Sequence, residues 1–580
     1  MEKVTLTIDG QQVQVNPDTT VLDAAKQCGI HIPTLCYMAE INEIGACRVC
    51  VVEANGRIVA SCVTPVADGM EVKTTTPDVR EARKTVVELM ISNHPMECLT
   101  CVRSGQCDLQ ELAENLGIRE VPYEGDRTEF PVDDSSPSLV RDPEKCILCR
   151  KCEAVCSQVQ KADVLRGQGR GFDTIVAPAF NLPLTDVACT MCGQCIHVCP
   201  VGAITEKDET AKVWDALGND KHTVVQIAPA VRVAIGEEFG MAPGTLTTGK
   251  VYAALRRLGF DKVFDTNFTA DLTILEEGHE LIERLNDPEA ELPMITSCSP
   301  GWIKYIEHFY PELTKHLSTC KSPQQMFGAL AKTYYPEQVN LDAKDIYSVS
   351  IMPCTAKKYE AERPEMNSSG YQDVDAVLTT RELARMIKEA GIDFANLEDE
   401  EADAPMGIYT GAGTIFGATG GVMEAAVRTA YEVVTGEPMP DINLTGVRGL
   451  QGVKDAELDL KGQTVKVAVA HGLSNAAELM ELIAKGEADY QFIEIMACPG
   501  GCVGGGGQPF PTNAEVREAR AKGLYNDDAG QEYRKSHDNP AVTTLYDDFL
   551  GQPLGHKSHE LLHTKYTKRD KFPMCSCEKE

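Results

Sequence analysis

The sequence predicts a multidomain chain of α+β and α/β domains, and three observations support this. Sixteen of the 23 cysteines precede residue 200, and nearly all of them stand at iron–sulfur spacings. Residues 1–15 alternate between apolar and polar side chains around Asp9-Gly10, which is typical of a β-hairpin. From about residue 220, apolar strand-like runs alternate with helical stretches such as 249–258, which indicates an α/β core.

The composition excludes several classes of protein. The formal net charge of −32 argues against binding to nucleic acid or to an anionic membrane surface. No run of about 18 apolar residues appears, so no membrane span is expected. The N-terminal residues contain no apolar signal segment. Cysteines clustered as C-x-x-C without a signal sequence favour metal binding in a reducing cytoplasm over disulfides in a secreted protein.

The first cysteine motif has the order long gap, C-x2-C, long gap. It consists of Cys36, Cys47, Cys50 and Cys62, with Gly45 and Ala46 beside it. Four thiolates fit a [2Fe–2S] cluster. A structural zinc site is the alternative, but the preceding sheet pattern favours the cluster. Residues 1–78 therefore resemble a plant-type ferredoxin domain with a β-grasp fold, although the first gap is longer than in soluble ferredoxins.

A second motif combines three cysteines with one histidine. Apolar residues at helical spacing, from Val79 to Met90, lead into His94, Cys98, Cys101 and Cys107. A lone histidine is usually a surface or core residue, but its place four residues before a C-x2-C favours a ligand role. Replacing a thiolate by an imidazole raises the potential of a cluster. Residues 79–125 are thus predicted to be a small His/Cys domain with one [4Fe–4S] cluster.

Two similar cysteine runs follow a polar, proline-containing linker over residues 123–139. They are Cys146, Cys149, Cys152 and Cys156, then Cys189, Cys192, Cys195 and Cys199. In bacterial two-cluster ferredoxins the fourth cysteine of each run binds the other cluster. We therefore assign Cys199 to the first [4Fe–4S] cluster and Cys156 to the second, within a domain over residues 137–208. Cys28 is left over and is expected to be a buried apolar thiol.

Three later cysteines follow apolar runs in the α/β region. Cys354 comes after residues 346–352, while Cys498 and Cys502 come after residues 492–497. Ligands in α/β sheets bind beyond the carboxyl ends of strands, so two strand ends offer three thiolates to one place. The neighbouring glycines, 500, 501 and 504–507, allow the backbone to pack closely around a bulky group.

Three motifs in this region resemble those of [FeFe]-hydrogenase catalytic subunits. They are Thr296-Ser297-Cys298-x-Pro300-Gly301-Trp302, Met352-Pro353-Cys354-Thr355-Ala356-Lys357-Lys358, and Glu494-x-Met496-Ala497-Cys498-x-Gly500-Gly501-Cys502. The resemblance implies an H-cluster domain over residues 209–565. Its cofactor is a [4Fe–4S] cube joined through a cysteine sulfur to a diiron site with CO, CN⁻ and azadithiolate.

The resemblance also assigns residues to this cofactor. Cys354, Cys498 and Cys502 are implied as ligands of the cube, with Cys502 bridging to the diiron site. Lys357 is implied as the donor to a cyanide. The residues implied to line the diiron pocket are Ala228, Pro229, Gln324, Met352 and Met496.

The chain departs from the family at Cys298-Ser299, where two adjacent cysteines are usual. The first normally relays protons and the second is the fourth ligand of the cube. Without gaps, Cys298 keeps the relay position and Ser299 occupies the ligand position. Three alternatives are open: the serine oxygen binds the cube, Cys298 binds it after a loop shift, or that iron is held otherwise.

The resemblance implies a proton path from Cys298 through Glu277, Ser318 and Glu280, with Arg284 near the surface end. Glu277 and Glu280 are three residues apart and share a helix face. Two such glutamates usually form a solvated face, but the match to the family favours the relay. A relay carboxylic acid needs a raised pKa, which burial would provide.

We therefore expect reversible H₂ formation, with electrons passing through one [2Fe–2S] and three [4Fe–4S] clusters. One rival is an iron–sulfur subunit of an NADH or formate dehydrogenase, against which the motifs at 298, 354 and 498 argue. The other is a sensor or iron–sulfur carrier, which would be expected to lose the relay residues. The electron partner is a ferredoxin or a flavin/NAD-binding subunit. In the tail, residues 566–580, Cys575-x-Cys577 is either part of a shared site or two free thiols.

Overall fold

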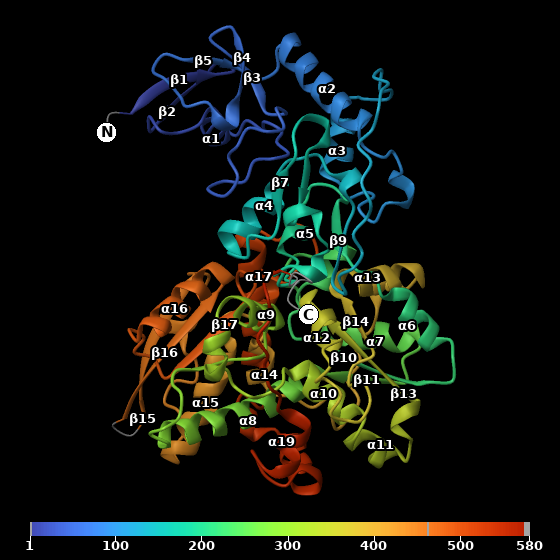
Figure 1. Cartoon of the computed structure of the whole chain (residues 1–580), viewed down its shortest axis with the longest axis vertical. Coiled ribbons are helices and arrows are strands. Elements are labelled where there is room, and N and C mark those ends of the chain that lie inside the picture. Colours follow the sequence, from blue (N-terminus) through green and yellow to red (C-terminus); the bar gives the residue numbers. More distant parts are fainter. Residues whose placement is uncertain (1–2, 461–462, 573–580) are drawn as a thin grey trace, which may run out of the picture.

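The computed structural model describes residues 3–460 and 463–572 (Figure 1). Its first part is a five-stranded sheet in the order β2-β1-β5-β3-β4. The elements are β1 (Val4–Ile8), β2 (Gln11–Val15), β3 (Val51–Ala54), β4 (Arg57–Ala60), β5 (Glu71–Lys73) and the helix α1 (Val21–Gln27). β1 and β2 pair antiparallel, which confirms the hairpin. The hydroxyl of Thr20 accepts from the backbone N–H of Asp23 and so caps α1.

A long helix, α2 (Pro77–Ser92), connects this sheet to the next cysteine loop, which is followed by α3 (Asp108–Asn115). The predicted linker over residues 123–139 extends too far at its C-terminal end. Leu139 already belongs to the strand β6 (Leu139–Arg141), which pairs antiparallel with β9 (Ile204–Glu206). This pairing closes the two-cluster part of the chain, since it joins the residues before the first cysteine run to those after the second.

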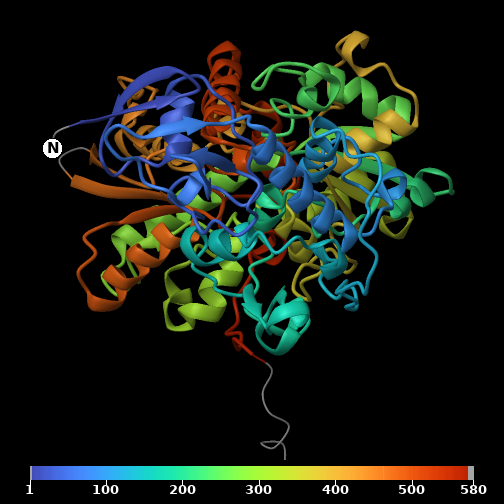
Figure 2. The same ribbon diagram turned by 90° about the horizontal axis from the view of Figure 1, so that it is seen from above.

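Each of the two cysteine runs contains a short helix. These helices are α4 (Lys151–Ala154), which ends in a π-helical turn over Val155–Val159, and α5 (Gln194–Val198). Between the runs lies a small hairpin of β7 (Arg166–Gln168) and β8 (Ile175–Ala177). Figures 1 and 2 show that these front parts stack over one end of the large domain.

The large domain contains two four-stranded sheets, in the orders β11-β10-β13-β14 and β12-β17-β16-β15. The first is all parallel and consists of β10 (His222–Ile227), β11 (Lys262–Asp265), β13 (Ile346–Met352) and β14 (Ala376–Thr379). In the second sheet only β15 (Val453–Leu460) is antiparallel; the others are β12 (Met294–Ile295), β16 (Gln463–His471) and β17 (Phe492–Met496). The α/β core predicted after residue 220 is therefore confirmed.

Helices cover both sheets, and one helix packs against both. The 21-residue helix α8 (Thr266–Asn286) contributes to the core beside β10 through Phe268 and Leu272. It also contributes to the core beside β16 and β17 through Ala270 and Ile274. α8 therefore holds the two sheets in a fixed relation, with their carboxyl ends facing one region. No helix in the described part of the chain has the length and apolar composition needed to cross a bilayer.

Candidate active site

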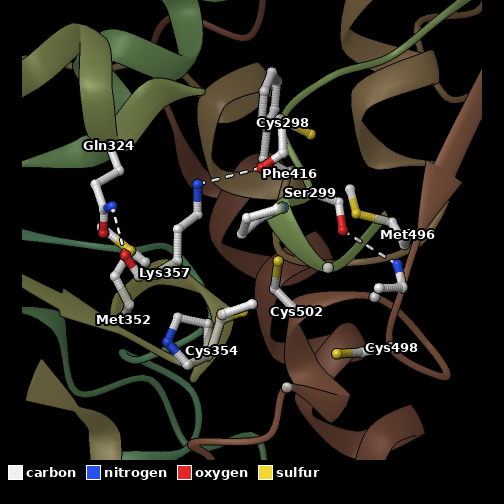
Figure 3. Close-up of a pocket in the computed structure, with 18 of the residues that line it drawn as sticks. Cys298, Ser299, Gln324, Met352, Cys354, Lys357, Phe416, Met496, Cys498 and Cys502 are labelled. Carbon is white, nitrogen blue, oxygen red and sulfur yellow. Dashed lines mark hydrogen bonds between the residues drawn. The ribbon is translucent and has the colours of Figure 1, made fainter. Parts of the chain in front are cut away.

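Strand ends from both sheets meet at one internal cavity (Figure 3). β10 is followed by Ala228-Pro229, β12 by Cys298-Ser299, β13 by Cys354, and β17 by Cys498 and Cys502. All these residues line the cavity, as do Gln324, Met352, Lys357, Phe416 and Met496. Two of these strand ends were expected from the sequence. The apolar run over residues 223–228 also predicted β10, although no site was assigned to its end. β12 was not recognised, because it is only two residues long and its motif follows without an apolar run.

Three thiols point into this cavity from two loops. Cys498 is buried, Cys354 and Cys502 are half-buried, and all three line the cavity. Burial raises the pKa of the Cys502 thiol to about 12 and also raises that of Cys354. A cavity in which burial favours protonated thiols suits a group whose metal charge replaces the thiol protons.

The glycines around the cavity are required by close backbone contacts. A Cβ at Gly505 would lie 2.2 Å from the carbonyl oxygen of Pro353, and one at Gly501 would lie 2.6 Å from the backbone nitrogen of Thr419. Gly501 also has a φ of 89°, which other residues rarely adopt. These close contacts around the cavity are therefore consistent with the predicted packing of the backbone around a bulky group.

Cys298 and Ser299 face different surroundings. The Ser299 hydroxyl accepts from the backbone N–H of Ala497 at 3.2 Å, next to Cys498. Cys298 packs beside Phe416, apart from the three thiols in Figure 3. Burial raises the pKa of the Cys298 thiol well above its usual value, and the nearby Glu277 carboxyl raises it further. Ser299 thus lies on the Cys498 side, while Cys298 lies on the side of the glutamates.

Lys357 is held in the cavity wall by three groups. Its ammonium donates to the Cys298 carbonyl oxygen at 3.2 Å and to Glu360 Oε2 at 2.8 Å. Gln324 Nε2 donates to the Lys357 carbonyl oxygen and to the same Glu360 oxygen. Glu360 was not singled out in the sequence, although it lies one helical turn after Lys357, where a partner for a buried lysine is expected.

The predicted proton-path residues form a buried row on α8 and the segment after β12. Glu277 is 2% exposed, and burial, with a smaller contribution from Glu280, raises its pKa to about 8. Ser318 donates to Glu280 Oε2 at 3.1 Å, and Arg284 donates to Glu280 Oε1 at 2.6 Å. Neither glutamate lies on a solvated face. The burial expected of a relay carboxyl is present.

The eight cysteines of the two runs surround two small cavities. Cys146, Cys149, Cys152 and Cys199 line one, whereas Cys156, Cys189, Cys192 and Cys195 line the other. The fourth cysteine of each run thus lies with the first three of the other run. Cys192 also lines the active-site cavity. The second cavity is therefore the one adjacent to Cys498 and Cys502.

The other predicted ligands lie farther from the active site. Cys36, Cys47, Cys50 and Cys62 are all buried, and the Cys50 and Cys62 sulfurs are 3.3 Å apart. His94 is near Cys98, Cys101 and Cys107 in sequence, and its buried Nδ1 has no hydrogen-bond partner in the described residues. A buried imidazole nitrogen without a hydrogen-bond partner is available as a metal ligand. Cys98 is exposed.

One apolar cluster connects three of these sites. It contains Cys36 and Cys47 of the first motif, Cys107 of the second, and Cys146, Cys149 and Cys199 of the first cavity. Asn42 Nδ2 donates both to the Cys36 carbonyl and to the Cys149 carbonyl, at 2.7 and 3.0 Å. The first cavity is therefore a junction between the two front sites and the active-site side.

The remaining cysteines are structural or lie outside the described part. Cys320 is fully buried in the core beside β10. Cys28 is only half-buried, contrary to the expectation of a buried thiol, because it ends α1 at the domain surface. Cys575 and Cys577 lie outside the described residues.

Polar contacts between the front parts and the large domain were not anticipated. His197 Nε2 lies 2.6 Å from the Gly505 carbonyl oxygen, Gln194 Nε2 donates to the Gly504 carbonyl at 2.9 Å, and Thr355 donates to the Met191 carbonyl at 2.8 Å. His197 and Gln194 lie inside the second cysteine run. Their spacing from the cysteines gave no sign of a partner about 300 residues away.

Family models match nearly the whole chain. The models, by description, are a 2Fe-2S iron-sulfur cluster binding domain (residues 1–77), the NADH-ubiquinone oxidoreductase-G iron-sulfur binding region (83–122), a 4Fe-4S dicluster domain (145–203), the iron only hydrogenase large subunit, C-terminal domain (221–506), and the iron hydrogenase small subunit (514–569). The rival dehydrogenase resemblance is therefore limited to the front part.

Individual relatives match over their full lengths. The NADP-reducing hydrogenase subunit HndD of Solidesulfovibrio fructosivorans is 52% identical over 99% of this chain and 100% of that protein. Iron hydrogenase 1 of Clostridium pasteurianum is 44% identical over 97% of this chain and 100% of that protein. A structure of a variant of the [FeFe]-hydrogenase HydA1 from Chlamydomonas reinhardtii has 45% identity and a TM-score of 0.57, covering 63% of this chain and 100% of that one. On these matches and this fold, the chain belongs to the iron-only, or [FeFe], hydrogenases, with accessory iron–sulfur domains.

Proposed function

We propose that this iron hydrogenase interconverts H₂ with protons and electrons at an H-cluster held by Cys354, Cys498 and Cys502. The observation that carries the proposal is the cavity where these three thiols, Lys357 and Cys298 converge from two sheets. When bound, the cofactor supplies the metal centre on which H₂ is made or split. The protein binds it, excludes water and moves the proton.

The proposed roles follow from where each side chain lies. Lys357, fixed by Glu360, offers an ammonium to an anionic ligand of the cofactor, while Gln324, Met352, Met496, Ala228 and Pro229 shape its pocket. Ser299 faces the Cys498 side and is the candidate fourth ligand. Cys298 passes the proton to Glu277, from which Ser318 leads to Glu280 beside Arg284.

Electrons take the row of accessory sites. We propose one [2Fe–2S] cluster on the first motif, one [4Fe–4S] cluster on His94 and its three cysteines, and one in each of the two cavities. Because Cys192 lines both the second cavity and the active site, that cluster is the direct electron partner of the H-cluster. The junction at the first cavity lets electrons arrive from either front site.

The electron partner is proposed from the relatives. Since one full-length relative is a subunit of an NADP-reducing hydrogenase, we infer that this chain works with a flavin- and nicotinamide-binding subunit, or with a ferredoxin. A partner with a basic face would complement the net charge of −32.

Infrared spectroscopy tests the proposal directly. Anaerobically matured protein is expected to show metal-bound CO and CN⁻ bands and to oxidise H₂ with a viologen dye. Protein that contains its accessory clusters but shows neither the bands nor H₂ oxidation would contradict the proposed function. It would then favour the alternative of an iron–sulfur carrier.

A further inference from the structure

The hydrogen-bonded row does not stop at Glu280. Its carboxylate accepts from Arg284, from Ser318, and from both the backbone N–H and the hydroxyl of Thr319, the last at 3.2 Å. The Thr319 hydroxyl also lies 2.8 Å from Nδ1 of His563. A hydroxyl can accept one proton while donating another. Thr319 therefore connects Glu280 to an imidazole.

Arg284 cannot carry the proton onward in the same way. A guanidinium stays protonated in proteins and has no acceptor atom. At 2.6 Å from Glu280 it stabilises the charged carboxylate, and it is also fixed by the carbonyl oxygen of Leu317 at 2.8 Å. Direct release of a proton from Glu280 past Arg284 would need water. Along the Thr319 branch, no water is needed between Glu280 and the His563 imidazole.

His563 is held firmly in this position. Its Nε2 lies 3.2 Å from Oε2 of the buried Glu276, whose other oxygen accepts from Tyr546. The backbone around it pairs with the segment that carries Thr319, through Lys321 N–H to the Leu562 carbonyl and Thr564 N–H to the Thr319 carbonyl, both at 2.8 Å. The ring also packs against that of His559, an exposed residue, with centroids 4.3 Å apart and the ring planes tilted by 43°.

We propose that Thr319 and His563 form a second branch of the proton relay, which leads from Glu280 to the surface beside His559. The proposal rests on the proposed hydrogenase function. It also assigns a task to the C-terminal segment that matches the iron hydrogenase small subunit, since His563 lies within residues 514–569. That segment supplies a relay group that the large-subunit part does not contain.

One proton moves through the branch at a time. During H₂ oxidation the Glu280 acid passes its proton to the Thr319 oxygen as the Thr319 hydroxyl proton passes to Nδ1 of His563. The resulting imidazolium is stabilised at Nε2 by the Glu276 carboxylate and loses one proton to solvent on the His559 side. The ring returns to the tautomer with an unprotonated Nδ1 before the next transfer. Glu280 ends as a carboxylate, Thr319 ends as a neutral hydroxyl, and His563 ends neutral. The reverse order delivers a proton for H₂ formation.

Paired substitutions test the branch in the full-length matured protein. Thr319→Val removes the hydroxyl at nearly constant shape, whereas Thr319→Ser restores it. Thr564→Val is the matched control, because the Thr564 hydroxyl is buried on the same backbone pair but has no partner among the described residues. His563→Gln keeps a hydrogen-bonding side chain that cannot carry a proton. The CO and CN⁻ bands report whether each variant contains the H-cluster, and thermal unfolding reports whether it is folded.

We expect Thr319→Val and His563→Gln to lower turnover about tenfold or more, with an increased solvent isotope effect. Thr319→Ser and Thr564→Val should match the wild type in turnover and in solvent isotope effect. The branch would be overturned if Thr319→Val and His563→Gln contain the H-cluster and still show wild-type turnover and isotope effect. The proposed hydrogenase function would be unaffected by that result. If Thr319→Ser fails to restore turnover, the role of Thr319 is structural and the branch is wrong. Wild-type protein without CO and CN⁻ bands would instead overturn the proposed function, and the branch with it.

Discussion

Nε2 of His197 lies 2.6 Å from the carbonyl oxygen of Gly505, so a residue inside the second cysteine run hydrogen-bonds the glycine loop of the active site. A carbonyl can only accept, so Nε2 must donate. Burial lowers the pKa of His197 to about 3, with Arg381 contributing next, so the ring is neutral. This neutral donor fixes the loop next to Cys502 against the accessory cluster site.

Replacing His197 with alanine should weaken this connection. Leaving the Gly505 carbonyl without its donor is expected to cost about 1–3 kcal/mol of the free energy of unfolding. We also expect slower reduction of the accessory clusters by H₂, measured by stopped-flow absorbance. His197→Gln, which keeps a side-chain N–H, is the control. Equal cluster reduction rates in wild type and alanine variant would show that the contact has no role in electron transfer.

Gly506 is a second point where the two parts meet. A Cβ there would lie 2.5 Å from the Cys192 carbonyl oxygen and 2.7 Å from Cα of Gly193. Gly506→Ala should therefore separate the cluster loop from the active-site loop and lower H₂ oxidation at least tenfold. Gly530→Ala, at an exposed position with no atom within 4 Å of the added Cβ, should have no effect. Wild-type activity in Gly506→Ala would contradict this close packing.

The pH dependence of turnover should reflect Glu277. Its pKa of about 8 means that the carboxyl holds its proton below that pH and loses it above. Proton reduction should therefore decline as the pH rises through about 8, and Glu277→Gln should lower turnover about 100-fold or more. Rates measured across pH 6–10 with a viologen donor give the profile. A profile that is flat through this range would contradict the assignment.

The same group also predicts how stability depends on pH. Folded Glu277 keeps its proton up to pH about 8, whereas the unfolded carboxyl releases it near 4.5. The folded state therefore binds more protons between these values, and the free energy of unfolding should fall as the pH rises through this window. Glu277→Gln lacks this contribution. Denaturant unfolding of both proteins at pH 5 and pH 8 should show the smaller decrease in the variant.

Substitutions at Cys298 and Ser299 separate relay from ligation. Since Cys298 lies on the Glu277 side and Ser299 on the Cys498 side, Cys298→Ala should lose turnover while the cube remains. Ser299→Cys should retain the cube, and Ser299→Ala should lower its occupancy if the serine oxygen is the ligand. Iron content and electron paramagnetic resonance report the cube. Loss of the cube in Cys298→Ala would reverse the assignment.

Spacing along the chain predicted those features that depend on local sequence. The hairpin around Asp9-Gly10 and the α/β core are confirmed because turn residues and apolar runs act over a few residues. The same holds for the thiols at the ends of β13 and β17, since a strand must end where its apolar run ends. The predicted linker extends too far because β6 is set by its pairing with β9. That pairing joins residues about 65 positions apart, which local sequence does not show.

The sequence by itself determined which residues are the candidates for holding iron, since the C-x-x-C spacings and the three hydrogenase motifs depend only on positions along the chain. Only the tertiary structure decided which side chains meet. Glu360 beside Lys357, His197 on Gly505, and Thr319 between Glu280 and His563 are all set by packing between distant segments. The physical reason is burial: a polar group removed from water must find a partner, and that partner comes from whichever segment the fold brings near.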